Sequence, residues 1–132
     1  MSILNKFKKQ QPQVLKISKQ IPSGLIAQTD QGYFYIKGQK KFKFVSDNAM
    51  RSWNLPVIKT TSDILNKYVS AGILGYRDGT LVKDISDGRI YLISDSKRRL
   101  IVEPEVFEWL PGDIKEVGRK EISIHTQGDV LE

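Results

Sequence analysis

Short runs of apolar residues, rich in aromatic and β-branched side chains, alternate with polar turns along most of the chain. Such runs predict β-strands rather than long helices. Short strands are predicted where "GLIAQ" and "GTLVK" follow a turn, and longer ones at "YFYIK" and "RIYLIS". Each longer strand is followed by a tight turn and a second run, "KKFKFV" or "RRLIV", which indicates two β-hairpins. "PVIKT" and "DIKEV" are predicted to be closing strands.

A short helix is predicted after each hairpin. Ser46 or Asp47 can cap the first helix, and Pro104 suits the first position of the second. Between the two hairpin regions, "TTSDILNKYVSAGILGY" carries apolar residues at helical spacing and ends in glycines. This stretch is predicted to be a helical connector.

The two hairpin regions match each other residue by residue. An offset of 57 carries Tyr33 to Ile90 and continues without a gap to the predicted closing strands. Upstream, Gly24 and Gly79 are only 55 apart, which places two additional residues in the second copy's loop, "KDISDGR". Similarity at a period above fifty indicates one supersecondary unit used twice, with each copy too small to bury its apolar face alone.

The predicted fold is therefore mainly β with short helices. It consists of two tandem β-hairpin–helix–strand repeats that share one core and are joined by the helical connector. The expected segments are a basic N-terminal arm at 1–21, repeat 1 at 22–60, the connector at 61–76, repeat 2 at 77–118 and a C-terminal tail at 119–132.

Composition narrows the functional classes. The 132 residues include no cysteine, which excludes disulfides and thiol chemistry. They include a single histidine, His125, which disfavours a zinc site. No apolar run approaches the ~20 residues that cross a bilayer, and no signal-peptide pattern follows the first residues, so synthesis in a cytoplasm is expected. The net charge of +6 is compatible with binding to nucleic acid, docking on an acidic protein surface, or solubility.

Basic residues gather beyond each hairpin turn and in the N-terminal arm. Beside Tyr33, Tyr35 and Phe42 they could bind phosphates while the rings stack on bases. We favour the alternative that they cover the solvent face of the hairpins and protect an exposed sheet edge. The arm also contains apolar residues and could reach a partner or an anionic surface, or be a frayed end. The candidate interaction residues are Lys6, Lys8, Lys9, Lys40, Lys41, Lys43, Lys97, Arg98 and Arg99.

The two tryptophans are candidates for core anchors or for sugar-stacking platforms. We favour the core for Trp53 and Trp109, together with Met50 and Phe107, because tryptophans beside hairpins usually pack inward and leave one polar edge wet. The repeat does not align them: at the offset of 57, Trp53 falls on Leu110.

Carboxylates at Asp84, Asp87 and Asp95 occur in predicted turns, where backbone hydrogen bonding accounts for this residue type. We find no nucleophile, base or metal-ligand set at catalytic spacing, and no glycine-rich phosphate loop. The sequence thus predicts no enzyme, no cofactor and no metal.

The segment at 78–110, "DGTLVKDISDGRIYLISDSKRRLIVEPEVFEWL", resembles a tandem repeat module of bacterial surface or secreted proteins and of phage proteins, with a pattern like "DGTLVK…YLI..GKKRPI.SPEVF". The first copy matches more loosely, and Leu100 stands where the pattern has proline. The resemblance implies a small β-rich binding or structural module and brings no catalytic residues.

These observations predict a non-enzymatic structural or assembly protein, made in a host cytoplasm and carried in a phage virion, in the head, neck or tail/baseplate. Its expected partners are other protein subunits, with an acidic protein surface or nucleic acid as further candidates. The first alternative is a nucleic-acid-binding accessory protein that uses the basic hairpins. The second is a cell-wall or glycan-binding module that uses the tryptophans.

Overall fold

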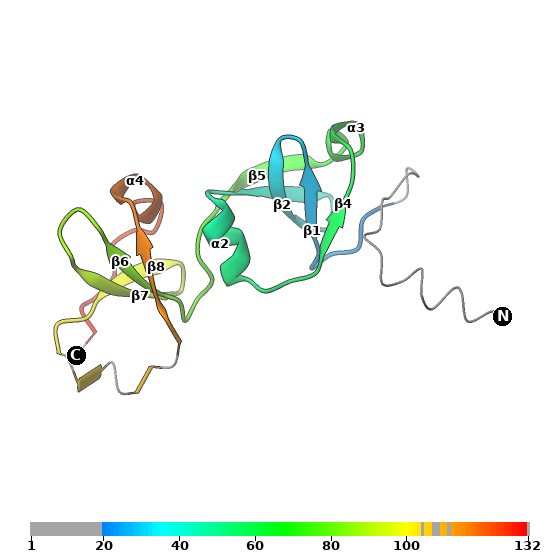
Figure 1. The fold of residues 1–132 in the computed structure, drawn as a ribbon. Coiled ribbons are helices and arrows are strands. Elements are labelled where there is room, and N and C mark those ends of the chain that lie inside the picture. Colours follow the sequence, from blue (N-terminus) through cyan, green and yellow to red (C-terminus); the bar gives the residue numbers. More distant parts are fainter. Residues whose placement is uncertain (1–19, 104, 107–108, 111, 132) are drawn as a thin grey trace, which may run out of the picture. The chain divides into compact units, whose positions relative to one another are not determined.

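A computed structural model describes residues 20–131 except 104, 107, 108 and 111, and the chain divides into two compact units (Figure 1). Unit 1 consists of the residues up to Phe44 and of Asn54–Leu74, and unit 2 consists of Val45–Trp53 and Gly75–Glu132. The mainly β prediction is confirmed, with two sheets and short helices. No helix of the described residues has the length and apolar character needed to span a membrane.

Unit 1 is built on a five-stranded sheet in the order β4-β1-β2-β3-β5. The first three strands form antiparallel neighbours, as the hairpin pattern predicts. The outer strands are parallel to their neighbours, β4 to β1 and β5 to β3. The elements are β1 (Ile26–Thr29), β2 (Gly32–Lys37), β3 (Lys40–Phe44), β4 (Val57–Lys59), α3 (Ser62–Leu65) and β5 (Val69–Leu74).

Unit 2 has the same arrangement in a four-stranded sheet with the order β8-β7-β6-β9, in which β9 is parallel to β6. Arg98 and Ile101 form parallel bridges with Gln127 and Leu131, so the C-terminal segment takes the place beside β8 that β5 takes beside β3. The elements are α2 (Asp47–Ser52), β6 (Leu81–Asp84), β7 (Ile90–Ser94), β8 (Lys97–Leu100), β9 (Ile114–Val117) and α4 (Arg119–Ile122).

The strand topology repeats at the offsets seen in the sequence. Gly24 and Gly79 both have a φ of 92°, a left-handed conformation that glycine adopts without strain. Their N–H groups donate to the carbonyls of Ile36 and Ile93, at 2.9 and 2.7 Å. The turn between β6 and β7 is longer than the one between β1 and β2, where the two additional residues were placed.

The repeat predicted a single core shared by both copies. The structure differs, because each of the apolar clusters formed by described residues lies within one unit. Every unit has its own strand, hairpin, parallel strand and helical turn, so it can cover its own sheet. The buried members in unit 1 are Ile21, Ala27, Phe34, Ile36, Leu65 and Tyr68. Those in unit 2 are Ala49, Tyr76, Val82, Tyr91, Ile93, Val117 and Ile122, with a second group of Leu81, Ile101 and Val106.

The segment predicted as a helical connector has a different structure. Only α3 is helical, and from Val69 the chain is extended and pairs with β3, beginning with a bond from the Val69 N–H to the Gln39 carbonyl at 2.9 Å. Apolar residues at helical spacing were misleading here because β3 offers a free edge, and tertiary pairing overrides local propensity. Gly72, with a φ of 130°, also lies outside helical geometry.

The helix α2, predicted to belong to repeat 1, is instead part of unit 2. Its cap residue Ser46 bonds to Glu121, and Ser52 Oγ accepts a hydrogen bond from the N–H of Arg77 at 3.0 Å. Glu121 also accepts a hydrogen bond from Tyr76 Oη at 2.6 Å, and burial together with this bond raises the pKa of Tyr76. These polar contacts, together with the packing of Ala49 in the apolar cluster of unit 2, hold α2 against residues of the second copy.

Candidate functional site

Two of the basic hairpin residues are directed inward and stabilise the fold. Lys41 Nζ donates to the carbonyl of Leu65 at 2.9 Å, at the end of α3. Its equivalent, Arg98, donates through Nη1 to the carbonyl of His125, just after α4. Each cation also lies over an aromatic ring of the neighbouring strand, at 5.6 and 5.8 Å from the ring centroid. Cations are favourable at helix C-terminal carbonyls and over aromatic rings, so these two residues act as structural contacts.

The remaining basic candidates differ in their surroundings. Arg99 Nε donates to the carbonyl of Asp129 at 3.0 Å. The side chains of Lys40, Lys43 and Lys97 are exposed. The arm residues Lys6, Lys8 and Lys9 lie outside the described residues. The internal contacts use half of the hairpin cations. The arrangement therefore favours the interpretation that these residues protect the hairpins, and it disfavours a continuous phosphate-binding surface.

The two tryptophans have different environments. Trp53 is partly buried and donates through Nε1 to a backbone carbonyl of unit 2 at 2.9 Å, and Met50 is buried, as predicted. Trp109 is 73% exposed, so its predicted place in the core is wrong. The reason is that Leu110, the residue matched to Trp53 by the repeat, packs against the apolar cluster instead. Phe107 lies outside the described residues.

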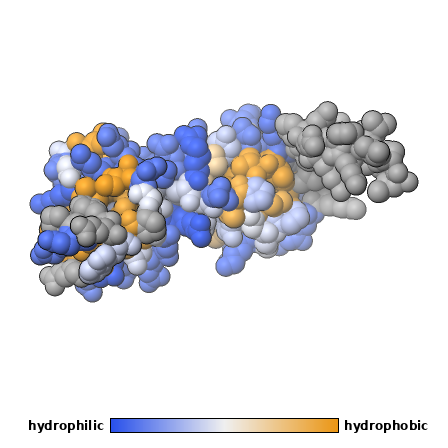
Figure 2. Space-filling view, turned by 60° about the horizontal axis from the view of Figure 1, so that its bottom comes forward, coloured by the Kyte–Doolittle hydropathy of each residue, from blue (hydrophilic) through white to orange (hydrophobic). Residues whose placement is uncertain are grey.

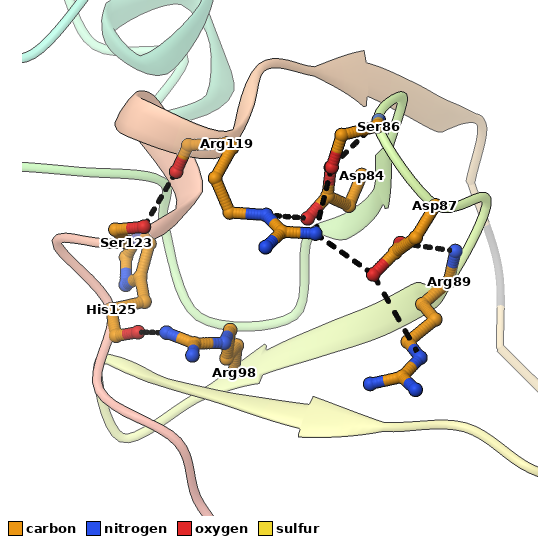
Figure 3. Close-up of polar contacts among 8 residues, drawn as sticks. All are labelled: Asp84, Ser86, Asp87, Arg89, Arg98, Arg119, Ser123 and His125. Carbon is orange, nitrogen blue, oxygen red and sulfur yellow. Dashed lines mark hydrogen bonds and ion pairs between the residues drawn. The ribbon is translucent and has the colours of Figure 1, made fainter.

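A buried carboxylate in unit 2 forms the centre of a polar cluster (Figure 3). Asp84 is 2% exposed, and its Oδ1 accepts hydrogen bonds from the N–H and Oγ of Ser86 at 2.9 and 2.6 Å. Its Oδ2 accepts one from Arg119 Nε at 2.8 Å. The bonds from Ser86 first, and then those from Arg119, hold the pKa of Asp84 below its usual value, although burial acts in the opposite direction.

Arg119 connects this buried group to the surface. Its Nη2 donates to Ser86 Oγ at 2.7 Å and to Asp87 Oδ2 at 3.0 Å. The hydrogen bond with Asp84 raises the pKa of Arg119. Arg89 Nε lies 3.8 Å from the same Asp87 oxygen. Two carboxylates and two guanidinium groups therefore form one continuous network.

This network forms one wall of a cavity of about 120 Å³, which we call the arginine pocket. Three guanidinium groups and two carboxylates line it, which leaves one excess positive charge. Arg119 Nη1 and Arg98 Nη2 have no hydrogen-bond partner among the residues that the structure describes. The pocket is lined by Asp84, Asp87, Arg89, Tyr91, Arg98, Leu100, Arg119, Ile122 and Gln127.

Unit 1 has a simpler contact in the equivalent place. Ser62, which matches Arg119 at the offset of 57, donates its Oγ to Asp30 Oδ1 at 2.7 Å. In both copies a side-chain hydrogen bond thus links the first residue of a short helix to the loop between the first two strands of that unit. Among the described residues, this contact has charged groups on both sides in unit 2 alone, because Arg119 stands where unit 1 has Ser62.

Sequence reasoning identified part of this cluster. The turn interpretation is right for Asp87, which accepts a hydrogen bond from the N–H of Arg89, and for Asp95, whose φ is 54°. Asp84 is instead the last residue of β6, although it does accept the expected backbone bond, from the N–H of Ser86. The contribution of Arg119 was missed because this residue lies in the segment predicted as a tail. Its match to the start of α3 in the repeat was the available signal.

Comparison of the chain with protein-family models, with curated proteins and with solved structures gives no match. The resemblance of the segment at 78–110 to a tandem repeat module therefore stays a prediction.

Proposed function

We propose that this chain is a non-enzymatic assembly protein of a phage particle, in the head, neck or tail/baseplate, and that it docks on neighbouring protein subunits. The resemblance of the second repeat to modules of surface and phage proteins supports the setting. The strand β5 supports the docking, and it is the observation that carries the proposal.

The strand β5 is an edge strand with no charged side chain. Its sequence is VSAGIL, and β3 is its one neighbour in the sheet of the described residues. Val69 and Ile73 are 63% and 65% exposed. An uncharged apolar edge with free N–H and C=O groups is a template for pairing with another strand.

The other sheet edges carry charge. They are β4 with Lys59 and β9 with Lys115 and Glu116, whereas the C-terminal segment pairs with the outer side of β8. Charged residues on edge strands prevent unwanted pairing. Since these two edges carry charge and β5 does not, we infer that an extended segment of a neighbouring subunit adds a strand to β5.

The polar cluster supports a non-enzymatic function. The carboxylate of Asp84 is engaged by Ser86 and Arg119, and its pKa is lowered, which makes it a weak base. These groups are arranged for rigid charge pairing rather than for proton transfer.

Cross-linking from β5 tests the proposal. The chain contains no cysteine, so Ile73→Cys creates a unique position for a photoactivatable cross-linker. The variant is expressed in host cells that produce the particle, and purified particles are illuminated and analysed by mass spectrometry. We expect cross-links from position 73 to another particle protein.

The matched control is Ile85→Cys, because Ile85 is 60% exposed and lies in unit 2, away from β5 in the sequence. Absence of the chain from purified particles would overturn the particle assignment. Equal cross-linking from positions 73 and 85 would overturn docking at β5.

A further inference from the structure

We propose that the arginine pocket binds one carboxylate, supplied by an Asp or Glu side chain of a neighbouring subunit. The inference rests on the proposed docking function and adds the chemistry of the partner. It is argued from the charge, the free donors, the rigidity and the size of the pocket.

The pocket offers positive charge and unused donors. Its three guanidinium groups exceed its two carboxylates by one, and one added carboxylate would balance the charge. Within the described part of the chain, Arg119 Nη1 and Arg98 Nη2 form none of the internal hydrogen bonds. In Figure 3 the remaining nitrogen of Arg119 points away from both aspartates. Guanidinium groups bind carboxylates through short, charge-assisted hydrogen bonds.

The donors are held in place before any partner binds. Asp84 is buried and fixes Arg119 from one side, while Asp87 and Ser86 fix it from the other. Arg98 is fixed by its bond to the carbonyl of His125. Groups that are already ordered lose little conformational entropy on binding, which favours affinity and specificity.

The size and lining of the pocket suit a side chain. A volume of about 120 Å³ is well below the roughly 300–1,000 Å³ of sites for cofactors and drug-sized ligands. Tyr91, Leu100 and Ile122 contribute apolar surface to the lining, against which the methylene groups of an acidic side chain can pack.

The two copies provide an internal comparison. The inward cation is present in both copies, as Lys41 and Arg98, which marks it as part of the shared fold. Arg119 and Arg89 match Ser62 and Gly32, which carry no charge. Unit 1 has the same strand arrangement without these two charges, so packing alone does not account for them in unit 2.

Titration of the full chain with small probes tests the inference. The probe is the peptide N-acetyl-Gly-Glu-Gly-amide, and the matched control peptide has Gln in place of Glu. Nuclear magnetic resonance follows the Nε–Hε signals of Arg89, Arg98 and Arg119. We expect saturable shifts with the Glu peptide and none with the Gln peptide.

Substitution locates the binding. Arg89→Gln removes the excess charge, and because Arg89 is exposed and pairs only with Asp87 among the described residues, the fold should persist. We expect it to weaken binding of the Glu peptide by about threefold, the size of a surface charge interaction. Arg77→Gln removes an exposed arginine of unit 2 that does not line the pocket, and should leave binding unchanged.

Three patterns of shifts would overturn the inference. They are shifts with inorganic phosphate but not with the Glu peptide, equal shifts with the Glu and Gln peptides, and equal weakening by Arg89→Gln and Arg77→Gln. Absence of any shift would overturn it as well. Since the titration uses no particle, its failure leaves docking at β5 standing, and failed cross-linking leaves the pocket standing.

Discussion

At the level of single residues, the two copies perform the same polar tasks with different side chains. The N–H of Ile21 donates to Tyr68 Oη at 2.6 Å in unit 1. At the corresponding place in unit 2, the N–H of Tyr76 donates to His125 Nε2 at 2.9 Å. His125 Nδ1 lies 2.8 Å from the carbonyl of Ser96 and must donate to it, which fixes the neutral tautomer. The lone histidine thus has a structural role that its residue type alone did not reveal.

The buried carboxylate allows a prediction at the same scale. Asp84→Asn should lower the free energy of unfolding of unit 2 at pH 7 by about 1.5–3 kcal/mol, the range for hydrogen bonds to charged groups. Trp53 and Trp109 both belong to unit 2, so urea unfolding followed by tryptophan fluorescence reports on this unit. Asp113→Asn, at an exposed position, is the control and should leave stability within about 0.5 kcal/mol.

The effect of Asp84→Asn should also depend on pH. The folded-state pKa of Asp84 is lowered, so its charged form contributes stability above the unfolded-state value of about 3.9, and this contribution is lost as pH falls through the lower folded-state value. The difference between the original chain and the variant should therefore hold from pH 7 to about 4 and shrink below that. A difference that grows toward acid pH would contradict this account of the carboxylate.

At the level of elements, the inward cations connect each hairpin to a helical turn. Lys41→Met keeps most of the side chain but removes the bond to the carbonyl of Leu65 and the contact with the ring. We expect a loss of about 1 kcal/mol in the stability of unit 1. Lys40→Met, on an exposed neighbour, should change little. Urea unfolding followed by the amide signals of unit 1 measures the stability of both variants. Equal losses of stability in Lys41→Met and Lys40→Met would refute the role of the contact.

The elements also show how far the sequence could predict the structure. Alternation and turn residues predicted both hairpins, because these signals are local and match the register of Tyr35 with Phe42 and of Tyr91 with Leu100. The assignment of β5 failed because its pairing with β3 depends on distant residues. The arginine pocket was missed for the same reason: Asp84 and Arg119 are 35 residues apart, and only the folded chain brings them together.

For the whole molecule, separate apolar clusters imply separate stability. Each unit has fewer than 70 residues. A domain of about 60 residues buries only some 60% of the surface that its unfolded chain exposes, so each unit is marginal on its own. The chain also passes from unit 1 into unit 2 at Val45 and returns at Asn54 before Gly75 begins the remainder of unit 2. The units are thus joined by three crossings of the backbone.

Matched truncations in the two clusters test this separation. Leu65 and Ile122 occupy equivalent positions at the offset of 57, and each is 2% exposed. Changing either to alanine should cost about 2–5 kcal/mol, as buried truncations of this size do, which is enough to unfold a marginal unit. Hydrogen exchange should show Leu65→Ala removing protection from β1, β2 and β3 and sparing β6, β7 and β8, with the reverse for Ile122→Ala. If either change removed protection from both sets of strands, the two units would unfold as one body. That result would agree with the shared core that the repeat first predicted.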